Sequence, residues 1–443
     1  MIIEQAIDNK VNQINIPDTD KPRLIIIGGG FAGIELMKKL KTDQLQVVML
    51  DRHNYHTFQP LLYQVATAGL EPDSIAGPLR KIFENKSNFY FRMASVEEVL
   101  PEQKKVLTNI GELSYEYLVI ANGSKTNYFG NEEIYRNAFP LKQVPQALDL
   151  RSQILQNFEQ AVLTQDHKAL EKLLSFVIVG GGPTGVELAG ALGELKKHVL
   201  PKDYPDLDLN HMKIILVEGL DRLLPGMSEY AGEKALKYLE KFDVEVRLKT
   251  LVKSYDGEVA EMNDGSVILS KTLIWAAGVK GNLLPGLPED SIEKGRIKVN
   301  AFNELTDHKE IYAIGDIAMM KSEENPNGHP MLAPVAMQQG RHLAKNLQRL
   351  VEGKPMIPFK YYDKGTMATV GRNKAVVNLP NDLNFGGFFA WFIWLFIHLL
   401  YIIGFRRKIV VFSNWVWNYF TYDRGTRLII RPFNKERNFT PKD

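Results

Sequence analysis

Short apolar runs followed by glycine-rich turns occur at the start of the chain and again near its middle. The first run, residues 24–27, leads into a turn at 28–33, a mixed segment from 34 to 40 and a second apolar run at 47–50. Short apolar runs beside glycine are typical of buried parallel strands, and mixed segments with apolar residues at helical spacing are typical of helices. The chain therefore begins with a predicted strand–turn–helix–strand unit.

The same pattern returns further along the chain. A strand is predicted at 176–179, a glycine-rich turn at 180–185 with a helix directly after it, and a second strand at 214–217. Residues 89–119 alternate like a small antiparallel insert, and residues 140–174 have helical spacing of their apolar positions. Because chance repetition of the whole unit is improbable, the pattern predicts an α/β chain with two dinucleotide-binding folds.

Both turns fit the spacing G-x-G-x-x-G. The first glycine permits a tight turn, the second lets a pyrophosphate approach the backbone, and the third lets helix and strand pack closely. The N-terminus of the following helix offers free N–H groups to the phosphates. A structural turn without a ligand is the alternative for such a motif on its own.

An acidic residue ends the second strand of each unit, Asp51 in the first and Glu218 in the second. A carboxylate at this position accepts hydrogen bonds from a ribose 2′-OH and repels a 2′-phosphate. The sequence therefore predicts that the second site prefers NADH to NADPH. The alternative for Glu218 is a solvated acid in a loop.

Composition limits the chemistry further. The chain has 443 residues, 45% hydrophobic and 24% charged, with a net charge of +2, which is ordinary for a folded protein of two or three domains and gives no sign of a nucleic-acid surface. It has no cysteine, which excludes disulfides, thiolate metal sites, a cysteine nucleophile and a redox-active dithiol. Nine scattered histidines form no ligand cluster, so no metal site is expected. Residues 1–22 are polar and lack a signal-peptide core, and we expect a flexible arm there.

The C-terminal part is strongly apolar. Residues 383–405 contain no acidic residue, lysine or arginine, and 385–403 as a helix would measure about 28 Å, close to the hydrocarbon thickness of a bilayer. Three basic residues follow at 406–408, and 409–420 is again uncharged and rich in tryptophan and tyrosine, which favour membrane interfaces. A transmembrane helix, a buried core helix and a pair of helices lying in one leaflet are the three alternatives. His398 is either a packed helix histidine or a residue beside a headgroup or quinone.

With these elements placed, the chain after residue 22 resembles the flavoproteins with two dinucleotide-binding domains that are built like glutathione reductase, and most closely the type II NADH:quinone oxidoreductases. The resemblance is carried by 58–66 (FQPLLYQVA), by 333–340 (APVAMQQG), by 313–316 (AIGD), which looks like the A-x-G-D motif, and by the aromatic C-terminus. The sequence departs from the family pattern at two positions. Asn122 stands where members commonly have the threonine of an A-T-G turn, and Pro334 stands where many members have a glutamine that is assigned to the quinone site.

The resemblance implies two Rossmann-like domains and a C-terminal helical membrane-anchoring segment. It divides the chain into an arm at 1–22, an FAD-binding domain at 23–125 and 290–380, an NADH-binding domain at 126–289, and the anchoring segment at 381–443.

It also implies functional residues. Those expected to hold a tightly, non-covalently bound FAD are Gly28, Gly30, Phe31, Ala32, Gly33, Asp51, Arg52, Gly315, Asp316 and Ala336. Those expected to bind NADH are Gly180, Gly182, Thr184, Gly185, Glu187, Glu218 and Gly278. Those expected to contact the quinone are Pro60, Leu61, Pro334, Gln338 and Gln339; for the two glutamines, helix start and solvent exposure is the alternative.

The implied reaction is hydride transfer from NADH to the flavin and two-electron reduction of ubiquinone or menaquinone to quinol, without proton pumping. Glu187 is expected to supply or relay a proton; an acid placed there to favour the helix dipole is the alternative. The implied location is the cytoplasmic face of a bacterial inner membrane, with monotopic attachment favoured and a homodimer possible. A reductase of a soluble acceptor such as ferredoxin, or a membrane-attached redox sensor, is the rival function.

Overall fold

The computed structural model describes residues 13–434, and the chain packs into two compact units. Unit 1 comprises Met1–His56, Gly77–Lys125 and Val279–Asp363, and unit 2 comprises Thr57–Ala76, Thr126–Gly278 and Lys364–Asp443. Residues 57–76 and 364–380 therefore pack with unit 2, whereas the predicted domain division places them with the FAD-binding domain. The assignment of one cofactor to each domain stays a prediction.

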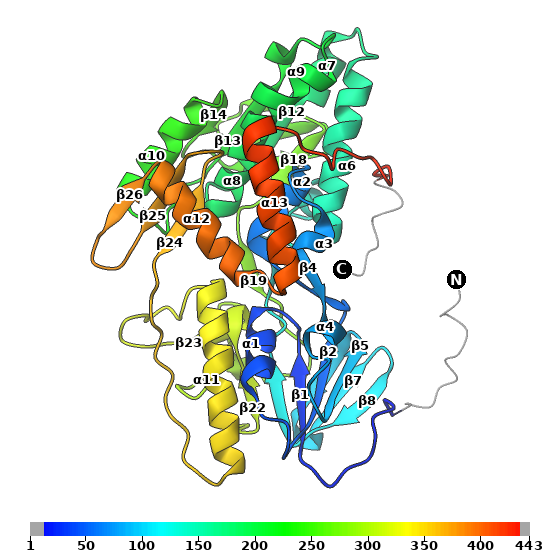
Figure 1. Cartoon of the computed structure of the whole chain (residues 1–443), viewed down its shortest axis with the longest axis vertical. Coiled ribbons are helices and arrows are strands. Elements are labelled where there is room, and N and C mark those ends of the chain that lie inside the picture. The colour runs from blue at the N-terminus through cyan, green and yellow to red at the C-terminus, as the bar shows by residue number, and fades with distance from the viewer. Residues whose placement is uncertain (1–12, 435–443) are drawn as a thin grey trace. The chain divides into compact units, whose positions relative to one another are not determined.

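Unit 1 is built on a five-stranded parallel sheet in the order β22-β9-β1-β2-β5 (Figure 1). Its strands are β1 (Arg23–Ile27), β2 (Gln46–Asp51), β5 (Phe89–Met93), β9 (Tyr117–Ile120) and β22 (Ile311–Ala313). The central strands are buried on both faces, which is why they read as continuous apolar runs.

Two helices of unit 1 pack closely against each other. They are α1 (Phe31–Lys39) and α11 (Ala333–Val351). A Cβ on Gly340 would lie 2.3 Å from the carbonyl oxygen of Ala32, so only glycine allows this approach. The guanidinium of Arg341 on α11 forms an ion pair with Glu35 on α1, with 2.5 Å between Nε and Oε2.

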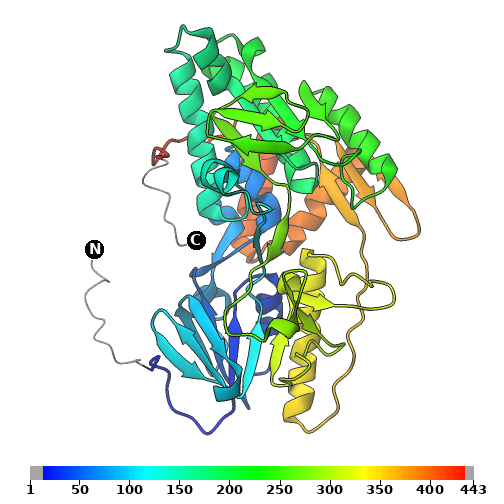
Figure 2. The same ribbon diagram turned by 180° about the vertical axis from the view of Figure 1, so that it is seen from behind.

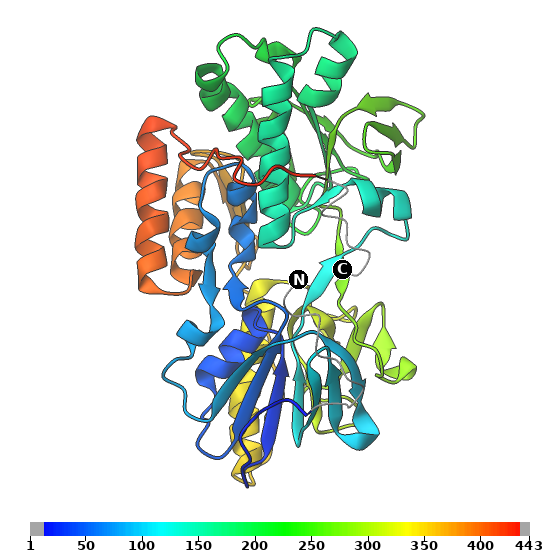
Figure 3. The same cartoon turned by 90° about the vertical axis from the view of Figure 1, so that its right-hand side faces the viewer.

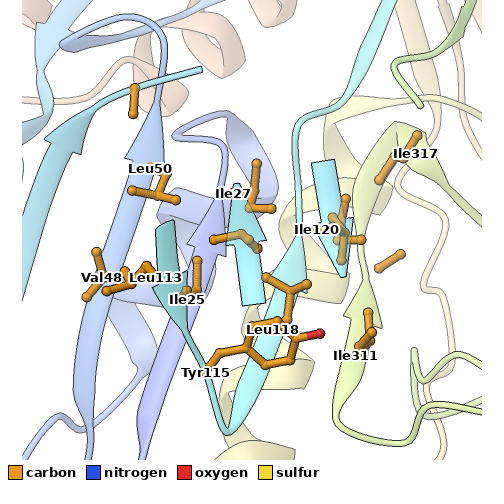
Figure 4. Packing of buried hydrophobic residues seen from close by; sticks show 14 of the residues in the cluster. Ile25, Ile27, Val48, Leu50, Leu113, Tyr115, Leu118, Ile120, Ile311 and Ile317 are labelled. Carbon is orange, nitrogen blue, oxygen red and sulfur yellow. The ribbon is translucent and has the colours of Figure 1, made fainter. Parts of the chain in front are cut away.

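A three-stranded antiparallel sheet joins the hydrophobic core of unit 1. It consists of β6 (Val96–Leu100), β7 (Lys105–Thr108) and β8 (Gly111–Ser114), drawn in cyan in Figure 2. Leu113 and Tyr115 meet the side chains of β1, β2 and β9 in the core (Figure 4). Ile14 and Ile16 are buried in the same cluster, so the last residues of the predicted arm belong to the packed structure; residues 1–12 lie outside the described part.

Unit 2 repeats the parallel sheet, here in the order β11-β18-β12-β13-β14. Its strands are β11 (Phe139–Pro140), β12 (Ser175–Val179), β13 (Lys213–Val217), β14 (Val244–Arg247) and β18 (Thr272–Trp275). Its helices include α6 (Val144–Ala161), α7 (His167–Leu174), α8 (Pro183–Glu194) and α10 (Glu229–Glu240). An antiparallel sheet of β15 (Val252–Tyr255), β16 (Val259–Met262) and β17 (Val267–Leu269) is green in Figure 2.

The C-terminal part of unit 2 begins with an antiparallel sheet of β24 (Thr366–Thr369), β25 (Ala375–Asn378) and β26 (Asn384–Gly386). Two helices follow, α12 (Phe388–Tyr401) and α13 (Phe405–Thr421), and they lie side by side (Figures 1 and 3). Gly404, with φ +91°, lies between them and interrupts the apolar stretch. No helix within residues 13–434 is both long enough and apolar enough to span a membrane.

The remaining short elements connect these layers. The short strands are β3 (Tyr55–Thr57), β4 (Ala76–Pro78), β10 (Ser124–Thr126), β19 (Val279–Gly281), β20 (Ile292–Glu293), β21 (Arg296–Val299) and β23 (Ala318–Met320). The short helices are α2 (Leu62–Ala66), α3 (Pro72–Ile75), α4 (Leu79–Ile82), α5 (Glu132–Asn137) and α9 (Leu200–Asp203).

Candidate functional site

The glycine-rich turn of unit 1 has the geometry that the motif predicts. Gly28 has φ +107°, and a Cβ there would lie 2.5 Å from the carbonyl oxygen of Ala121 on the neighbouring strand. A Cβ on Gly33 would lie 2.0 Å from the carbonyl oxygen of Gly28. A Cβ on Gly30 would have no neighbour within 4 Å. The first and third glycines are therefore required by packing, whereas the second faces open space where a pyrophosphate can approach the backbone.

The turn of unit 2 repeats this arrangement. A Cβ on Gly180 would lie 2.6 Å from the carbonyl oxygen of Ala276, and one on Gly185 would lie 1.9 Å from that of Gly180. A Cβ on Gly182 would again have no neighbour within 4 Å. Thr184 is exposed in the first turn of α8. Both turns thus leave the middle glycine open.

The helices that follow both turns offer their N-termini to a ligand. Gly30 caps α1 and Gly182 caps α8, and neither cap makes a side-chain hydrogen bond to the helix. Neither helix has an acidic residue in its first turn. The first N–H groups and the positive end of each helix dipole are therefore available to phosphates. These features fit one dinucleotide in each unit.

The predicted ribose-binding acids also hold the turns in place. Asp51 accepts hydrogen bonds from the backbone nitrogens of Gly29 at 2.6 Å and His53 at 2.7 Å. Glu218 accepts the equivalent bonds from Gly181 at 2.5 Å and Leu220 at 2.8 Å. Each carboxylate has lone pairs left for a ribose hydroxyl, since two oxygens offer about four acceptor positions. Burial raises the pKa of Asp51, and the two backbone hydrogen bonds partly oppose that shift.

Distant segments of unit 1 bring further predicted FAD residues together. A Cβ on Gly315 would lie 3.2 Å from Cβ of Ala32 and 3.3 Å from Cβ of Ala336, so these three residues meet where η6 (Gly315–Ile317), α1 and α11 converge. Asp316 accepts a hydrogen bond from Ser124 Oγ at 2.5 Å. Phe31 lies beside the predicted turn, and Arg52 is exposed next to Asp51.

Sequence reasoning missed several residues that support this region. His56 is buried, its ring packs edge-on to Phe31 with 5.2 Å between centroids, and its Nδ1 lies 3.0 Å from the carbonyl oxygen of Gly29. Burial lowers the pKa of His56 to about 4, so it stays neutral. The buried Arg296 donates from Nε to the carbonyl oxygen of Asp316 at 3.0 Å. No spacing or motif in the sequence connects these residues.

The two glutamines predicted to contact quinone are engaged within unit 1. The amide of Gln338 exchanges two hydrogen bonds with the backbone of Tyr362, at 2.9 and 3.0 Å. Gln339 is 1% exposed and accepts a hydrogen bond from the backbone nitrogen of Gly315 at 2.7 Å. We therefore do not carry the glutamines into the quinone site proposed below.

The other predicted residues lie on separate elements. Pro334 opens α11, and Pro60 and Leu61 lie in η1 (Gln59–Leu61), with Leu61 buried. Gly278, which was predicted to bind NADH, follows β18 in unit 2.

A pocket with a cavity volume of about 100 Å³, open at its mouth, lies within unit 2. Its lining combines aromatic rings with two carboxyls and two guanidinium groups. The lining residues are Tyr63, Gln64, Thr67, Gly69, Glu187, Ala191, Glu194, Thr369, Gly371, Arg372, Trp391, Trp394, Leu395, Trp415, Asn418, Tyr419 and Arg424.

Glu187 is the only one of these residues that was predicted to be functional. It lies in α8, is 6% exposed, and its Oε1 accepts a hydrogen bond from the backbone nitrogen of Thr369 at 3.4 Å. Burial raises the pKa of Glu187 to about 8, although Thr369 and the nearby Trp394 indole favour the charged form. The carboxyl therefore holds its proton at neutral pH.

An ion pair and a helix cap hold another part of the pocket wall. Glu194 accepts from Arg424 Nη2 at 3.1 Å, and Arg424 Nη1 donates to the carbonyl oxygen of Thr67 at 2.9 Å. Arg372 donates to the last carbonyl groups of α13, those of Asn418 at 2.7 Å and Tyr419 at 2.6 Å. These contacts attach α13 to the rest of unit 2.

His398 is a packed helix histidine. Its ring stacks on Trp394 with 3.9 Å between centroids, and its Nδ1 lies 2.8 Å from the carbonyl oxygen of Trp394. Burial lowers the pKa of His398 to about 4.

Two parallel sheets in one chain, each with an open glycine-rich turn and a strand-end acid, define an oxidoreductase with two dinucleotide sites. The family model described as pyridine nucleotide-disulphide oxidoreductase matches residues 22–340, and that of the NDH2 C-terminal domain matches residues 363–422. The chain belongs to this family and, within it, to the type II NADH:quinone oxidoreductases.

Named relatives and solved structures agree with this membership. The type II NADH:quinone oxidoreductase Ndh of Mycobacterium tuberculosis is 35% identical, over 91% of this chain and 89% of the relative. The type II NADH:quinone oxidoreductase of Staphylococcus aureus is 29% identical, over 81% and 89%. The structure of NDH2 from Plasmodium falciparum in complex with NADH has the same fold, with a TM-score of 0.86, 20% identity and coverage of 93% of this chain and 100% of that one.

Proposed function

We propose that this chain oxidises NADH with two-electron reduction of a membrane quinone, and that the quinone head group enters the pocket beside Glu187. Family membership supports the reaction. The observation that carries the choice of site is a buried, protonated carboxyl in the wall of an aromatic pocket. Aromatic rings suit a planar quinone, and a carboxyl with a pKa of about 8 suits proton transfer near neutral pH.

We assign the nucleotides to the two glycine-rich turns. The turn at Gly28–Gly33, with Asp51 and the cluster around Gly315, would hold FAD, and the turn at Gly180–Gly185, with Glu218, would hold NADH. Bound there, FAD would supply the two-electron chemistry between NADH and the quinone. The protein orients both ligands through backbone N–H groups and strand-end carboxylates.

Glu187 would contribute a proton. Conversion of quinone and NADH to quinol and NAD⁺ takes up one proton from the medium, because the hydride brings only one of the two that the quinol carries. The protonated carboxyl of Glu187 keeps such a proton at the pocket wall. After donating it, the carboxylate would be reprotonated from water, so that atoms and charge balance over the cycle.

The two C-terminal helices would attach the enzyme to one leaflet of a membrane. Each carries a row of exposed apolar side chains at helical spacing, while the opposite sides of the helices, including Trp394 and Val411, are buried. These rows contain Phe388, Phe389, Phe392, Ile393, Phe396 and Leu400 on α12 and Phe405, Ile409, Phe412, Val416, Trp417 and Phe420 on α13.

Basic residues at 406–408 lie in the first turn of α13, directly after Gly404, where lipid headgroups would meet them. Such rows favour helices that lie in the interface. Attachment to the cytoplasmic face of a bacterial inner membrane and a homodimer rest on the family resemblance and are part of this proposal.

The chemical proposal is tested with Glu187→Gln. Flavin reduction by NADH should keep its rate in stopped-flow absorbance, while reoxidation by a quinone analogue should slow by about tenfold or more. Glu233→Gln, an exposed residue on α10, is the matched control. Wild-type quinone turnover in Glu187→Gln would contradict the assignment. Failure of any quinone to accelerate NADH oxidation by the native protein would favour the redox-sensor or soluble-acceptor alternatives.

Membrane attachment is tested by flotation with phosphatidylcholine–phosphatidylglycerol vesicles. The triple variant Phe389→Ser, Phe392→Ser, Phe396→Ser should lose flotation, because it removes exposed apolar area from α12. A control triple, Leu163→Ser, Leu220→Ser, Val267→Ser, changes exposed apolar residues elsewhere and should float like the native protein. Equal flotation of both variants would overturn the assigned surface.

A further inference from the structure

The pocket contains a hydrogen-bond chain whose direction is fixed by its first member. The indole Nε1 of Trp415 on α13 donates to Oε1 of Gln64 at 2.8 Å. An indole N–H can only donate, so the amide of Gln64 must present its oxygen to Trp415 and its nitrogen to the other side. On that side, Nε2 of Gln64 donates to the hydroxyl oxygen of Tyr63 at 2.9 Å.

This direction determines which further hydrogen bond the Tyr63 hydroxyl can form. Its oxygen already accepts from Gln64, so the hydroxyl hydrogen is free to point elsewhere. Within residues 13–434 no hydrogen bond has the Tyr63 hydroxyl as its donor. Tyr63 is 5% exposed and lines the pocket together with Glu187. A buried O–H without an acceptor is costly unless a ligand supplies one.

We propose that Tyr63 donates a hydrogen bond to a quinone carbonyl oxygen, and that Gln64 and Trp415 are positioning residues that keep the Tyr63 hydroxyl in the donor role. A quinone carbonyl only accepts hydrogen bonds, so it matches the unused group. This inference rests on the proposed function, because it names a contact within the proposed quinone site.

The electrostatics of the pocket agree with a neutral donor. Burial raises the pKa of Tyr63 well above its usual value, and the charge of Glu187, when present, raises it further. Tyr63 therefore holds its hydrogen throughout the working pH range. It contributes an oriented hydrogen bond, while the net proton comes from Glu187.

The chain also connects the site to a helix with an apolar exposed row. Trp415 lies on α13 between Phe412 and Val416 of that row, but its indole turns inward to Gln64. The position of α13 therefore sets the orientation of the amide and, through it, of the phenol.

Two single variants and their combination test the direction of the chain. Tyr63→Phe removes the donor and keeps the ring, so kcat/KM for a quinone analogue should fall about tenfold. Gln64→Glu leaves the Tyr63 hydroxyl in place but puts a carboxylate beside it. Because a carboxylate only accepts, the hydroxyl should turn toward it and away from the pocket. Gln64→Glu should therefore lower kcat/KM for the quinone analogue by about the same factor as Tyr63→Phe.

The double variant distinguishes a directed chain from two independent defects. The double variant Tyr63→Phe, Gln64→Glu should lower kcat/KM for the quinone analogue no further than either single change, because it has no Tyr63 hydroxyl for the carboxylate to redirect. Lowering the pH until the introduced carboxyl is protonated should restore much of the activity of Gln64→Glu, because a carboxylic acid can again donate to Tyr63. Tyr230→Phe on α10 is the matched control for loss of a phenol and should behave like the native enzyme.

Flavin content and the rate of flavin reduction by NADH are measured for all variants and should not change. Additive losses in the double variant, or native kcat/KM in Tyr63→Phe, would overturn the inference. If Glu187→Gln slows quinone reduction while Tyr63→Phe does not, only the role of Tyr63 fails. If neither variant affects quinone reduction, the proposed quinone site itself fails.

Discussion

Glu187 and Glu194 lie about two turns apart on α8, both in the pocket wall, but only Glu194 is paired with a basic residue. Arg424 lies 3.1 Å from Glu194, whereas no lysine or arginine in the described part of the chain forms an ion pair with Glu187. One helix therefore carries a carboxylate held by a guanidinium and a carboxyl kept neutral by burial. The difference separates a structural acid from an acid that can give up a proton.

The first prediction concerns the pH dependence of stability. The folded state raises the pKa of Glu187 from 4.5 to about 8, so the folded chain binds the proton more tightly than the unfolded chain. Glu187 therefore reduces stability increasingly as pH rises from about 5 to 8, by at most about 1.4 kcal/mol per pH unit. Glu187→Gln should be more stable than the native protein at pH 8, and the gain should vanish near pH 4.5.

Denaturant unfolding of both proteins at several pH values measures this difference. Glu233→Gln should show no such trend, since Glu233 is exposed. A stability difference between Glu187→Gln and the native protein that is independent of pH would contradict the raised pKa.

The pair of Arg424 and Glu194 gives the second prediction. Both side chains are nearly buried, so removing one partner leaves an unpaired buried charge. Arg424→Met should lower the free energy of unfolding by about 3–5 kcal/mol. The double variant Arg424→Met, Glu194→Gln should recover part of this loss because it removes both charges. Thermal denaturation followed by circular dichroism provides the measurement, and a double variant less stable than Arg424→Met would argue against the pairing.

The glycines of the first turn give the third prediction. Ala at position 30 would place its Cβ in open space, so Gly30→Ala should fold normally but retain FAD about tenfold less tightly. Ala at position 33 would place its Cβ 2.0 Å from the Gly28 carbonyl oxygen, so Gly33→Ala should fold poorly. Gly182→Ala is the matched control in unit 2: it should raise KM for NADH and leave FAD content unchanged. FAD absorbance per chain distinguishes these outcomes, and native FAD retention in Gly30→Ala would contradict the assigned approach of the pyrophosphate.

Glu218 provides the fourth prediction. Glu218→Gln should reduce the preference for NADH over NADPH by about tenfold, because the negative charge that repels a 2′-phosphate is removed. The ratio of kcat/KM for the two nucleotides is the measurement. Asp221→Asn, three residues further on and in an exposed turn, is the control for loss of a nearby charge. An unchanged ratio in Glu218→Gln would restrict Glu218 to holding the backbone of Gly181 and Leu220.

Short-range patterns in the sequence were sufficient to predict the two dinucleotide-binding folds. Apolar runs, glycine spacing and strand-end acids act over a few residues, and the two parallel sheets with their open middle glycines follow the prediction. Glu187 was predicted from the family resemblance together with its place after the second turn, and its functional role stays a prediction.

Short-range sequence patterns did not predict the residues of the proposed quinone site. Gln338 and Gln339 were predicted to contact quinone, with helix start and solvent exposure as the alternative, and that contact stays untested. Hydrogen bonds to the backbone of Tyr362 and Gly315, which are distant in sequence, engage both side chains. Tyr63, Gln64 and Trp415 were not predicted, because the hydrogen bonds that orient them join α2 to α13.

The sequence by itself therefore determined the two nucleotide folds, the absence of thiol chemistry and the apolar character of the C-terminus. Only the tertiary structure decided that this apolar stretch turns at Gly404 into two short helices and that one side of each is buried. It also decided that, among residues 13–434, Glu194 forms an ion pair whereas Glu187 forms none. The reason is physical: a turn motif is encoded by neighbouring residues, whereas burial, pairing and the pKa of a carboxyl depend on side chains that folding brings together from distant parts of the chain.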